Sequence, residues 1–188
     1  MDPPIEAFIP TKSYFAGSEV DVADLEQLIR DSNVNDGILV YGLLKEKGIE
    51  ISYELKHAFL ELVCYYNCDE PLDEEWIEER WFKQTQRVKE RPRMTWKNSD
   101  VAEQCYHEIE PKEPRTYSCI IRGMCKYYQV EKANAIFNDC IANKIQLDVE
   151  AFNSIIGIGG MLKESAELLW NFIENNLKLM KERNVEPN

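Results

Sequence analysis

The fold is decided by the stretch Thr116-Tyr117-Ser118-Cys119-Ile120-Ile121, because a related stretch occurs 35 residues later. In Ala151-Phe152-Asn153-Ser154-Ile155-Ile156, an aromatic residue and two isoleucines stand at the same positions. Farther along the chain an offset of 40 residues aligns Phe137, Cys140, Ile145 and Asp148 with Leu177, Met180, Val185 and Asn188. Self-similarity at such a period is typical of helical repeat proteins.

Two earlier segments carry the same apolar spacing. Tyr41, Leu44, Ile49 and Ser52 lie 96 residues before Phe137, Cys140, Ile145 and Asp148. The stretch 106–109 lies 31 residues before the stretch 137–140, so one helix–turn–helix unit occurs about four times. A single hairpin buries one side of its apolar stripe, and a stacked copy must cover the other side. The sequence therefore predicts an all-α protein, an α-solenoid of stacked helical hairpins, with an open face formed by the first helix of each hairpin.

The composition along the chain predicts four parts. These are an irregular N-terminal segment at 1–20, the first helical repeat or repeats at 21–67, a charged insertion at 68–95, and further repeats at 96–188. Within the insertion an acidic block precedes a basic block, and Trp76 and Trp81 lie between them. Two interpretations stay open: a solvated linker with weak ion pairing between helical neighbours, or a docking element that uses the tryptophans.

The formal net charge of −12 at pH 7 bears on the class of partner. Binding to RNA normally depends on phosphate neutralisation by lysine and arginine, so it requires positive charge that is gathered locally. An acidic chain suits basic protein partners at least as well. No run of about 18 apolar residues occurs, which predicts no membrane partner.

Side chains suited to metal or enzyme chemistry do not form a set. The six cysteines include no CxxC pair, and we expect them to be buried structural thiols in a reducing compartment. His57 and His107 lie in different repeats and are expected to be polar surface or groove residues. The stretch 157–160 lacks the strand and the lysine of a phosphate loop. The sequence thus predicts a binding protein, not an enzyme, with no cofactor, no metal site and no small-molecule substrate.

The stretch from Thr116 to Lys126 resembles the start of a pentatricopeptide repeat, and the stretch from Asn143 to Asp148 resembles the loop that ends one. The stretches 62–66, 94–97 and 120–124 occur in the order found in pentatricopeptide repeat proteins of the mitochondrial small ribosomal subunit. This resemblance implies a ribosomal scaffold in the mitochondrial matrix that supports translation. Its partners would be ribosomal RNA, neighbouring small-subunit proteins and, as a further candidate, messenger RNA.

The same resemblance implies that this chain is an internal part of a longer protein. Residues 1–6 form neither a signal peptide nor an Arg-rich transit peptide, so any targeting peptide is expected to lie outside the chain. Two alternative functions remain: a free mitochondrial factor that binds transcripts, or a helical-repeat scaffold that binds peptides and no RNA. A groove lined by arginine and lysine would favour RNA, and a groove lined by acids would favour peptides.

Pentatricopeptide repeats read single-stranded RNA at about one base per repeat. The family uses a polar residue early in the first helix together with the last residue of the repeat. Here these pairs are Ser118 with Asp148, which resembles a purine-type pair, and Asn153 with Asn188, which resembles a pyrimidine-type pair. The competing interpretation is that Asp148 and Asn188 cap helices and that Ser118 and Asn153 are ordinary exposed residues.

Arg122 and Lys126 are the cations expected to contact phosphates. The competing interpretation is that they balance the many acids on the surface. The repeat that begins near residue 53 departs from the family pattern, because His57 takes the early polar position. A continuous RNA code is therefore not expected.

Overall fold

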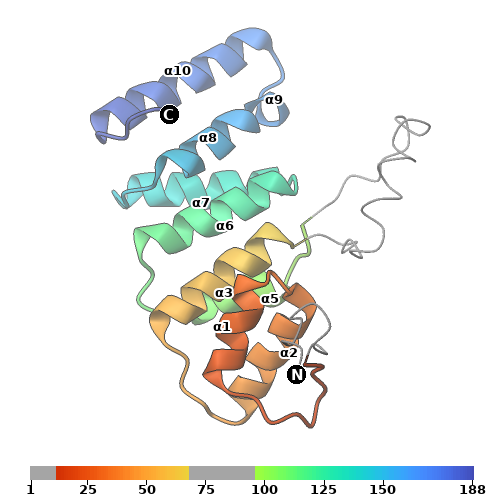
Figure 1. Cartoon of the computed structure of the whole chain (residues 1–188). Helices are drawn as coiled ribbons and strands as arrows, with labels where there is room; N and C mark the ends of the chain where they lie inside the picture. The colour runs from red at the N-terminus through yellow and green to blue at the C-terminus, as the bar shows by residue number, and fades with distance from the viewer. Residues whose placement is uncertain (1–11, 68–95) are drawn as a thin grey trace, which may run out of the picture. The chain divides into compact units, whose positions relative to one another are not determined.

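The computed structural model describes residues 12–67 and 96–188. Within these residues every regular element is a helix and none is a strand, which confirms the all-α prediction (Figure 1). The described residues belong to two compact units, divided between Leu55 and Lys56. The predicted charged insertion at 68–95 and the first eleven residues lie outside the described residues. No helix in the described part is long and apolar enough to cross a membrane.

The first unit contains a hairpin of α1 (Val22–Arg30) and α2 (Val34–Glu46). Asp21 begins α1 with a capping box, because its side chain accepts from the Asp24 amide while the Asp24 side chain accepts from the Asp21 amide. Asn33 caps α2. Gly48 follows α2 with a φ of 67°, a left-handed conformation that glycine adopts without strain and that commonly ends a helix.

The second unit contains the remaining helices, with α3 starting just before its boundary. In chain order they are α3 (Tyr53–Tyr65), α5 (Val101–Glu108), α6 (Pro114–Lys126), α7 (Val130–Ala142), α8 (Val149–Gly157), α9 (Gly159–Leu162) and α10 (Ala166–Glu182). In Figure 1 the helices from α6 to α10 follow one another as a stack of hairpins. The stacking of α8 on α6 and of α10 on α8 confirms the solenoid.

A shared hydrogen bond at the helix ends supports the internal repeat. The amide two residues after the helix cap donates to a carbonyl in the last turn, as in a Schellman motif. The bond occurs at 2.9 Å in three aligned copies: Ile49 to Leu44, Ile145 to Cys140, and Val185 to Met180. These are the residue pairs that the sequence offsets superpose, so the repeats share backbone geometry as well as apolar spacing.

Helix α6 is central to the second unit. Pro114 is its first residue, where the missing N–H costs nothing, and eight of its thirteen residues are buried. Across the next interface the rings of Phe137 on α7 and Phe152 on α8 meet edge to face, with centroids 5.2 Å apart. Phe152 is fully buried, and burial of such a side chain contributes about 1.5–3 kcal/mol.

Gly123 allows α3 and the segment around Trp96 to approach α6. A Cβ atom at Gly123 would lie 3.0 Å from Cys64 Cβ, from the Cys64 carbonyl oxygen and from the Trp96 ring. Cys105 on α5 contacts the Lys56 carbonyl of α3 through its thiol, at 3.8 Å. Helices α3 and α5 therefore form a third hairpin layer beside α6.

The glycines near residue 158 divide the last repeat. Helix α8 ends at Gly157, and the short α9 precedes α10. Gly159 is buried, and a Cβ atom there would lie 2.9 Å from Leu169 and 3.1 Å from Phe172. The sequence offsets of 35 and 40 residues differ by five, and a tight helical turn against α10 accommodates these five extra residues.

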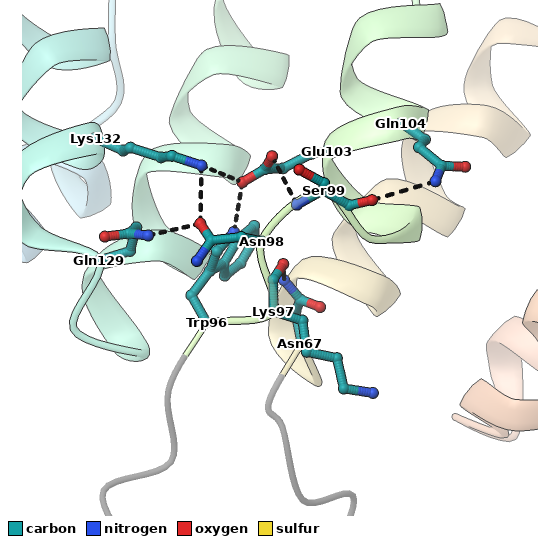
Figure 2. Close-up of polar contacts among 9 residues, drawn as sticks. All are labelled: Asn67, Trp96, Lys97, Asn98, Ser99, Glu103, Gln104, Gln129 and Lys132. Carbon is teal, nitrogen blue, oxygen red and sulfur yellow. Dashed lines mark hydrogen bonds and ion pairs between the residues drawn. The ribbon is translucent and has the colours of Figure 1, made fainter.

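A polar cluster that includes Trp96 ties α5 to α7 (Figure 2). Glu103 Oε1 accepts from Trp96 Nε1 at 2.9 Å and from Lys132 Nζ at 3.0 Å, and Oε2 accepts from the Ser99 amide. Burial alone would raise the pKa of Glu103, but the hydrogen bonds from Trp96 and Lys132 lower it below its ordinary value. Asn67 Nδ2 donates to the Lys97 carbonyl at 3.2 Å, which joins the two chain segments that flank residues 68–95.

Candidate nucleic-acid interface

In the second unit, the first helix of each hairpin is α3, α6 or α8. Residues at intervals of four along these helices align with one another between repeats. On α6 these are Ser118, Arg122 and Lys126; on α3 they are His57, Glu61 and Tyr65; on α8 the first is Asn153. Residues four apart lie on one face of a helix. Because α6 packs between α3 and α8, these seven residues form adjoining rows, which we call the first-helix stripe.

The first predicted pair is brought together by the fold. The Asp148 amide donates to Ser118 Oγ at 3.2 Å. Ser118 is only 1% exposed, so its hydroxyl positions the loop and is closed to a large ligand. Asp148 is exposed, and its Oδ1 accepts from the Ala151 amide at 2.8 Å as the N-cap of α8. Of this pair, Asp148 is therefore the member that a base can reach.

The second predicted pair makes a direct side-chain contact. Asn153 Nδ2 donates to Asn188 Oδ1 at 2.8 Å, and Asn188 Nδ2 donates to Glu150 Oε1 at 3.1 Å. Both asparagines are exposed. Each amide can donate and accept, so the pair presents a hydrogen-bonding edge to solvent at the end of the first-helix stripe.

The predicted cations differ in their surroundings. Arg122 is exposed in the middle of the stripe. Lys126 Nζ donates to the Tyr65 carbonyl at 2.7 Å and lies 3.1 Å from the centroid of the Tyr65 ring. Lys126 thus neutralises the C-terminal end of α3 and is held against an aromatic face. Lys126 and Tyr65 are neighbours because they occupy equivalent positions in successive first helices, α6 and α3.

Exposed tyrosines at this end of the stripe were not among the predicted site residues. Tyr65 is 58% exposed, Tyr66 is 43% exposed and Tyr128 is 48% exposed. The Tyr127 hydroxyl donates to the Tyr65 carbonyl. Aromatic faces beside a cation are suited to base stacking. The signal that reveals this group is the 61-residue offset between α3 and α6, which places Tyr65 beside Lys126.

His57 corrects an expectation from the sequence. It was expected at the surface or in a groove, but its side chain is 3% exposed. Its Nδ1 lies 3.6 Å from Glu61 Oε1, and its Nε2 is buried with no hydrogen-bond partner among the described residues. The first turns of α3 are covered on the side that carries His57, so this repeat presents Glu61 and Tyr65 instead.

The charge of the stripe differs from that of the chain. Arg122 and Lys126 are its cations and Glu61 is its carboxylate, whereas the whole chain has a formal net charge of −12. Lys132 and Arg115, two further cations of this unit, form ion pairs with Glu103 and Glu113. The exposed carboxylate of Asp148 beside the stripe balances its remaining positive charge, so this surface is close to neutral although the whole chain is acidic.

The described cysteines are packed into the core. Cys64, Cys105, Cys119, Cys125 and Cys140 are free and buried. Burial raises the pKa of Cys125 to about 12 and that of Cys140 to about 11. Among the described residues, no three side chains of metal-binding type come together.

Comparisons with known proteins identify the family of this chain. A family model described as "Small ribosomal subunit protein mS39, PPR" matches residues 1–129. The small ribosomal subunit protein mS39 of Drosophila melanogaster is 46% identical over 186 residues, covering 99% of this chain and 28% of the relative. Its Mus musculus counterpart is 30% identical over 203 residues, covering 100% of this chain and 29% of the relative. The Danio rerio counterpart is 24% identical over 184 residues, covering 90% of this chain and 28% of the relative.

The chain therefore spans less than a third of the length of these relatives. The family is one of ribosomal proteins, as the resemblance implies. Its description also names the pentatricopeptide repeat that the sequence resembles. With more than half of its residues matched by the model, the chain belongs to the pentatricopeptide repeat family of small ribosomal subunit protein mS39.

Proposed function

We propose that this chain is an RNA-binding pentatricopeptide repeat scaffold of the mitochondrial small ribosomal subunit. It works in the mitochondrial matrix and supports translation through contacts with ribosomal RNA, messenger RNA and neighbouring small-subunit proteins. Equivalence with pentatricopeptide repeat domain-containing protein 3 is part of this proposal. Its support is family membership, together with relatives that are themselves named as small-subunit proteins.

The first-helix stripe is the observation that carries RNA binding. Arg122 neutralises a phosphate, and Tyr65, which is 58% exposed, offers a base the part of its ring that Lys126 does not cover. Asp148 and the Asn153–Asn188 pair supply hydrogen-bonding groups for base edges. Each stacked base or edge contact contributes about 1–3 kcal/mol, so two readable repeats bind weakly alone. Weak, distributed contact suits a scaffold that is also held by its protein neighbours.

Sedimentation of mitochondrial extract through a density gradient tests the proposal. The protein is expected to migrate with the small ribosomal subunit at moderate salt. Recovery in light fractions at every salt concentration would contradict the ribosomal role and favour a free transcript-binding factor. Nuclease treatment separates the two kinds of contact, because protein neighbours hold the chain after accessible RNA is cut.

A charge-matched pair of variants tests the stripe itself. Arg122→Ala removes one phosphate contact, so its affinity for single-stranded RNA should fall, and the slope of log affinity against log salt should decrease by about 0.7. Lys178→Ala removes the same charge from α10, which is the second helix of its hairpin and lies outside the stripe. Lys178 is 63% exposed and pairs with Glu174. Equal effects of the two substitutions would show that only net charge matters and that the stripe does not bind RNA.

A further inference from the structure

A pocket of about 220 Å³ lies among α5, α6 and α7, apart from the residues of the first-helix stripe. Tyr106 and Tyr117 form its aromatic wall, Ile136 and Ile145 form its apolar wall, and Asp139 and Asn143 supply its polar groups. Its volume is below the range of about 300–1,000 Å³ that is usual for small-molecule sites. It is of a size for a single side chain from another protein.

The one charged group in the lining of the pocket is the carboxylate of Asp139, which accepts hydrogen bonds. Asp139 is exposed, and no cation among the described residues lies within ion-pair distance of its carboxylate. Asn143 Nδ2 donates one of its two N–H groups to the Asp139 backbone carbonyl at 2.8 Å, and its Oδ1 is a further acceptor. The pocket therefore suits a ligand with several donors and a positive charge.

The aromatic wall favours a guanidinium group over an ammonium group as the positively charged ligand. The Tyr106 and Tyr117 rings meet edge to face with centroids 6.1 Å apart. Guanidinium is planar, carries five donors and no acceptor, and stacks on aromatic faces. An ammonium group is more strongly hydrated and cannot bind a carboxylate through two parallel hydrogen bonds.

Two cations near the pocket are already engaged. Lys112 Nζ lies 5.3 Å from the Tyr106 ring centroid and 3.7 Å from Glu110 Oε1. Arg183 donates to the carbonyls of Ile145 and Ile141, at 2.9 and 2.7 Å. Asp139 is the only charged residue in the lining itself. A nucleotide would bring phosphate towards this carboxylate, so the charge at the pocket disfavours RNA.

We propose that this pocket binds an arginine side chain of a basic partner protein, with Asp139 pairing the guanidinium and Tyr106 and Tyr117 packing against it. The net charge of −12 draws such a partner to the chain. The proposal rests on the proposed function for the source of the arginine, which is a small-subunit protein next to the chain. The argument that the ligand is an arginine side chain depends only on the residues of the pocket.

Titration of the isotope-labelled chain with N-acetyl-arginine amide, followed by NMR, tests the binding. Saturable shifts are expected at the amides of Asp139 and Asn143, with binding at least about fivefold weaker for N-acetyl-lysine amide and for the uncharged citrulline analogue. Asp139→Asn should weaken arginine binding about tenfold. Glu131→Gln, an exposed acid on the same helix, should leave it unchanged.

The possible results of the titration distinguish the arginine pocket from the alternatives. Equal binding of the arginine and citrulline compounds, or no effect of Asp139→Asn, would overturn the arginine pocket. Shifts at the same amides with uridine monophosphate that strengthen in Asp139→Asn would assign the pocket to RNA instead. Failure of the proposed function would appear separately, as absence of the protein from the small-subunit fraction whatever the arginine result.

Discussion

Asn153 and Asn188 are joined side chain to side chain at 2.8 Å, although they lie 35 residues apart in sequence. The last residue of a repeat thus contacts the first helix of the same repeat. Ser118 and Asp148 show the same relationship through a side-chain-to-backbone bond over 30 residues. Such closure fixes the edge that each repeat presents to solvent.

The Asn153–Asn188 edge leads to a prediction about RNA affinity. Asn153→Ala removes an amide from this edge, so the affinity for a pyrimidine-rich single-stranded RNA should fall by about tenfold, in line with about 1–3 kcal/mol per edge contact. Fluorescence anisotropy with a labelled oligonucleotide measures the change. Asn171→Ala removes an equally exposed amide from α10 and should have no effect. A similar loss in both variants would show that this pair does not read RNA.

Gly123 gives a prediction about packing. Gly123→Ala places a methyl group 3.0 Å from the Cys64 backbone oxygen and the Trp96 ring, so the free energy of unfolding should decrease by about 1–3 kcal/mol. Gly42→Ala, also within a helix but with no atom within 4 Å of the new Cβ, should be neutral or stabilising by up to about 1 kcal/mol. Thermal unfolding followed by circular dichroism compares them. If Gly123→Ala is as stable as Gly42→Ala, then α3 does not pack against α6 as described.

Much of this architecture follows from the sequence offsets. The positions of Leu44, Cys140 and Met180 were aligned from apolar spacing, and each accepts the same capping hydrogen bond in the structure. Most helix ends were harder to locate, because Ser32, Tyr128, Lys144 and Asn184 adopt left-handed backbone conformations where glycine is the usual signal. Among the described residues, Gly48 is the one glycine with a positive φ.

The candidate site was less predictable, because burial depends on tertiary packing. Ser118 and His57 are polar and occupy equivalent positions, yet both are buried by neighbouring elements. Lys126 looked like a phosphate contact, but its partner Tyr65 lies 61 residues away in another repeat. Helical spacing places residues on one face. It does not reveal which part of that face the next hairpin covers.

The Glu103 cluster predicts a pH dependence of stability. The folded-state pKa of Glu103 is depressed below its ordinary value of 4.5, so its stabilisation is present above that pH and is lost as pH falls through the folded pKa. At pH 7, Glu103→Gln should lower the free energy of unfolding by about 1–3 kcal/mol, because a charged hydrogen-bond acceptor is lost. Urea titrations across acidic pH measure the difference, which should shrink below about pH 4.5.

A matched control for this effect is Glu182→Gln, which removes an exposed carboxylate at the end of α10. Its effect on the free energy of unfolding should be small both at pH 7 and at acidic pH. If the destabilisation by Glu103→Gln were as large at acidic pH as at pH 7, the substitution would act through packing and the charge of Glu103 would have no role.

The buried thiols predict selective resistance to alkylation. Burial raises the pKa of Cys125 to about 12 and that of Cys140 to about 11, and only the thiolate reacts. At pH 8, iodoacetamide should leave both cysteines unmodified in the folded chain and modify both in denaturing guanidinium. Peptide mass spectrometry resolves each site. Rapid modification of Cys125 in the folded chain would show that α6 is not buried as described.

The central claim is that the first helices of the second unit form the RNA-binding face of a ribosomal scaffold. Ultraviolet crosslinking of intact mitochondrial small subunits, followed by mass spectrometry of nucleotide-linked peptides, tests it most directly. We predict crosslinks on peptides that contain Tyr65, Lys126 or Asn153, with none on the exposed residues of α7 and α10. Crosslinks confined to α7 and α10, or protein recovered from subunits without any crosslinked nucleotide, would contradict the claim.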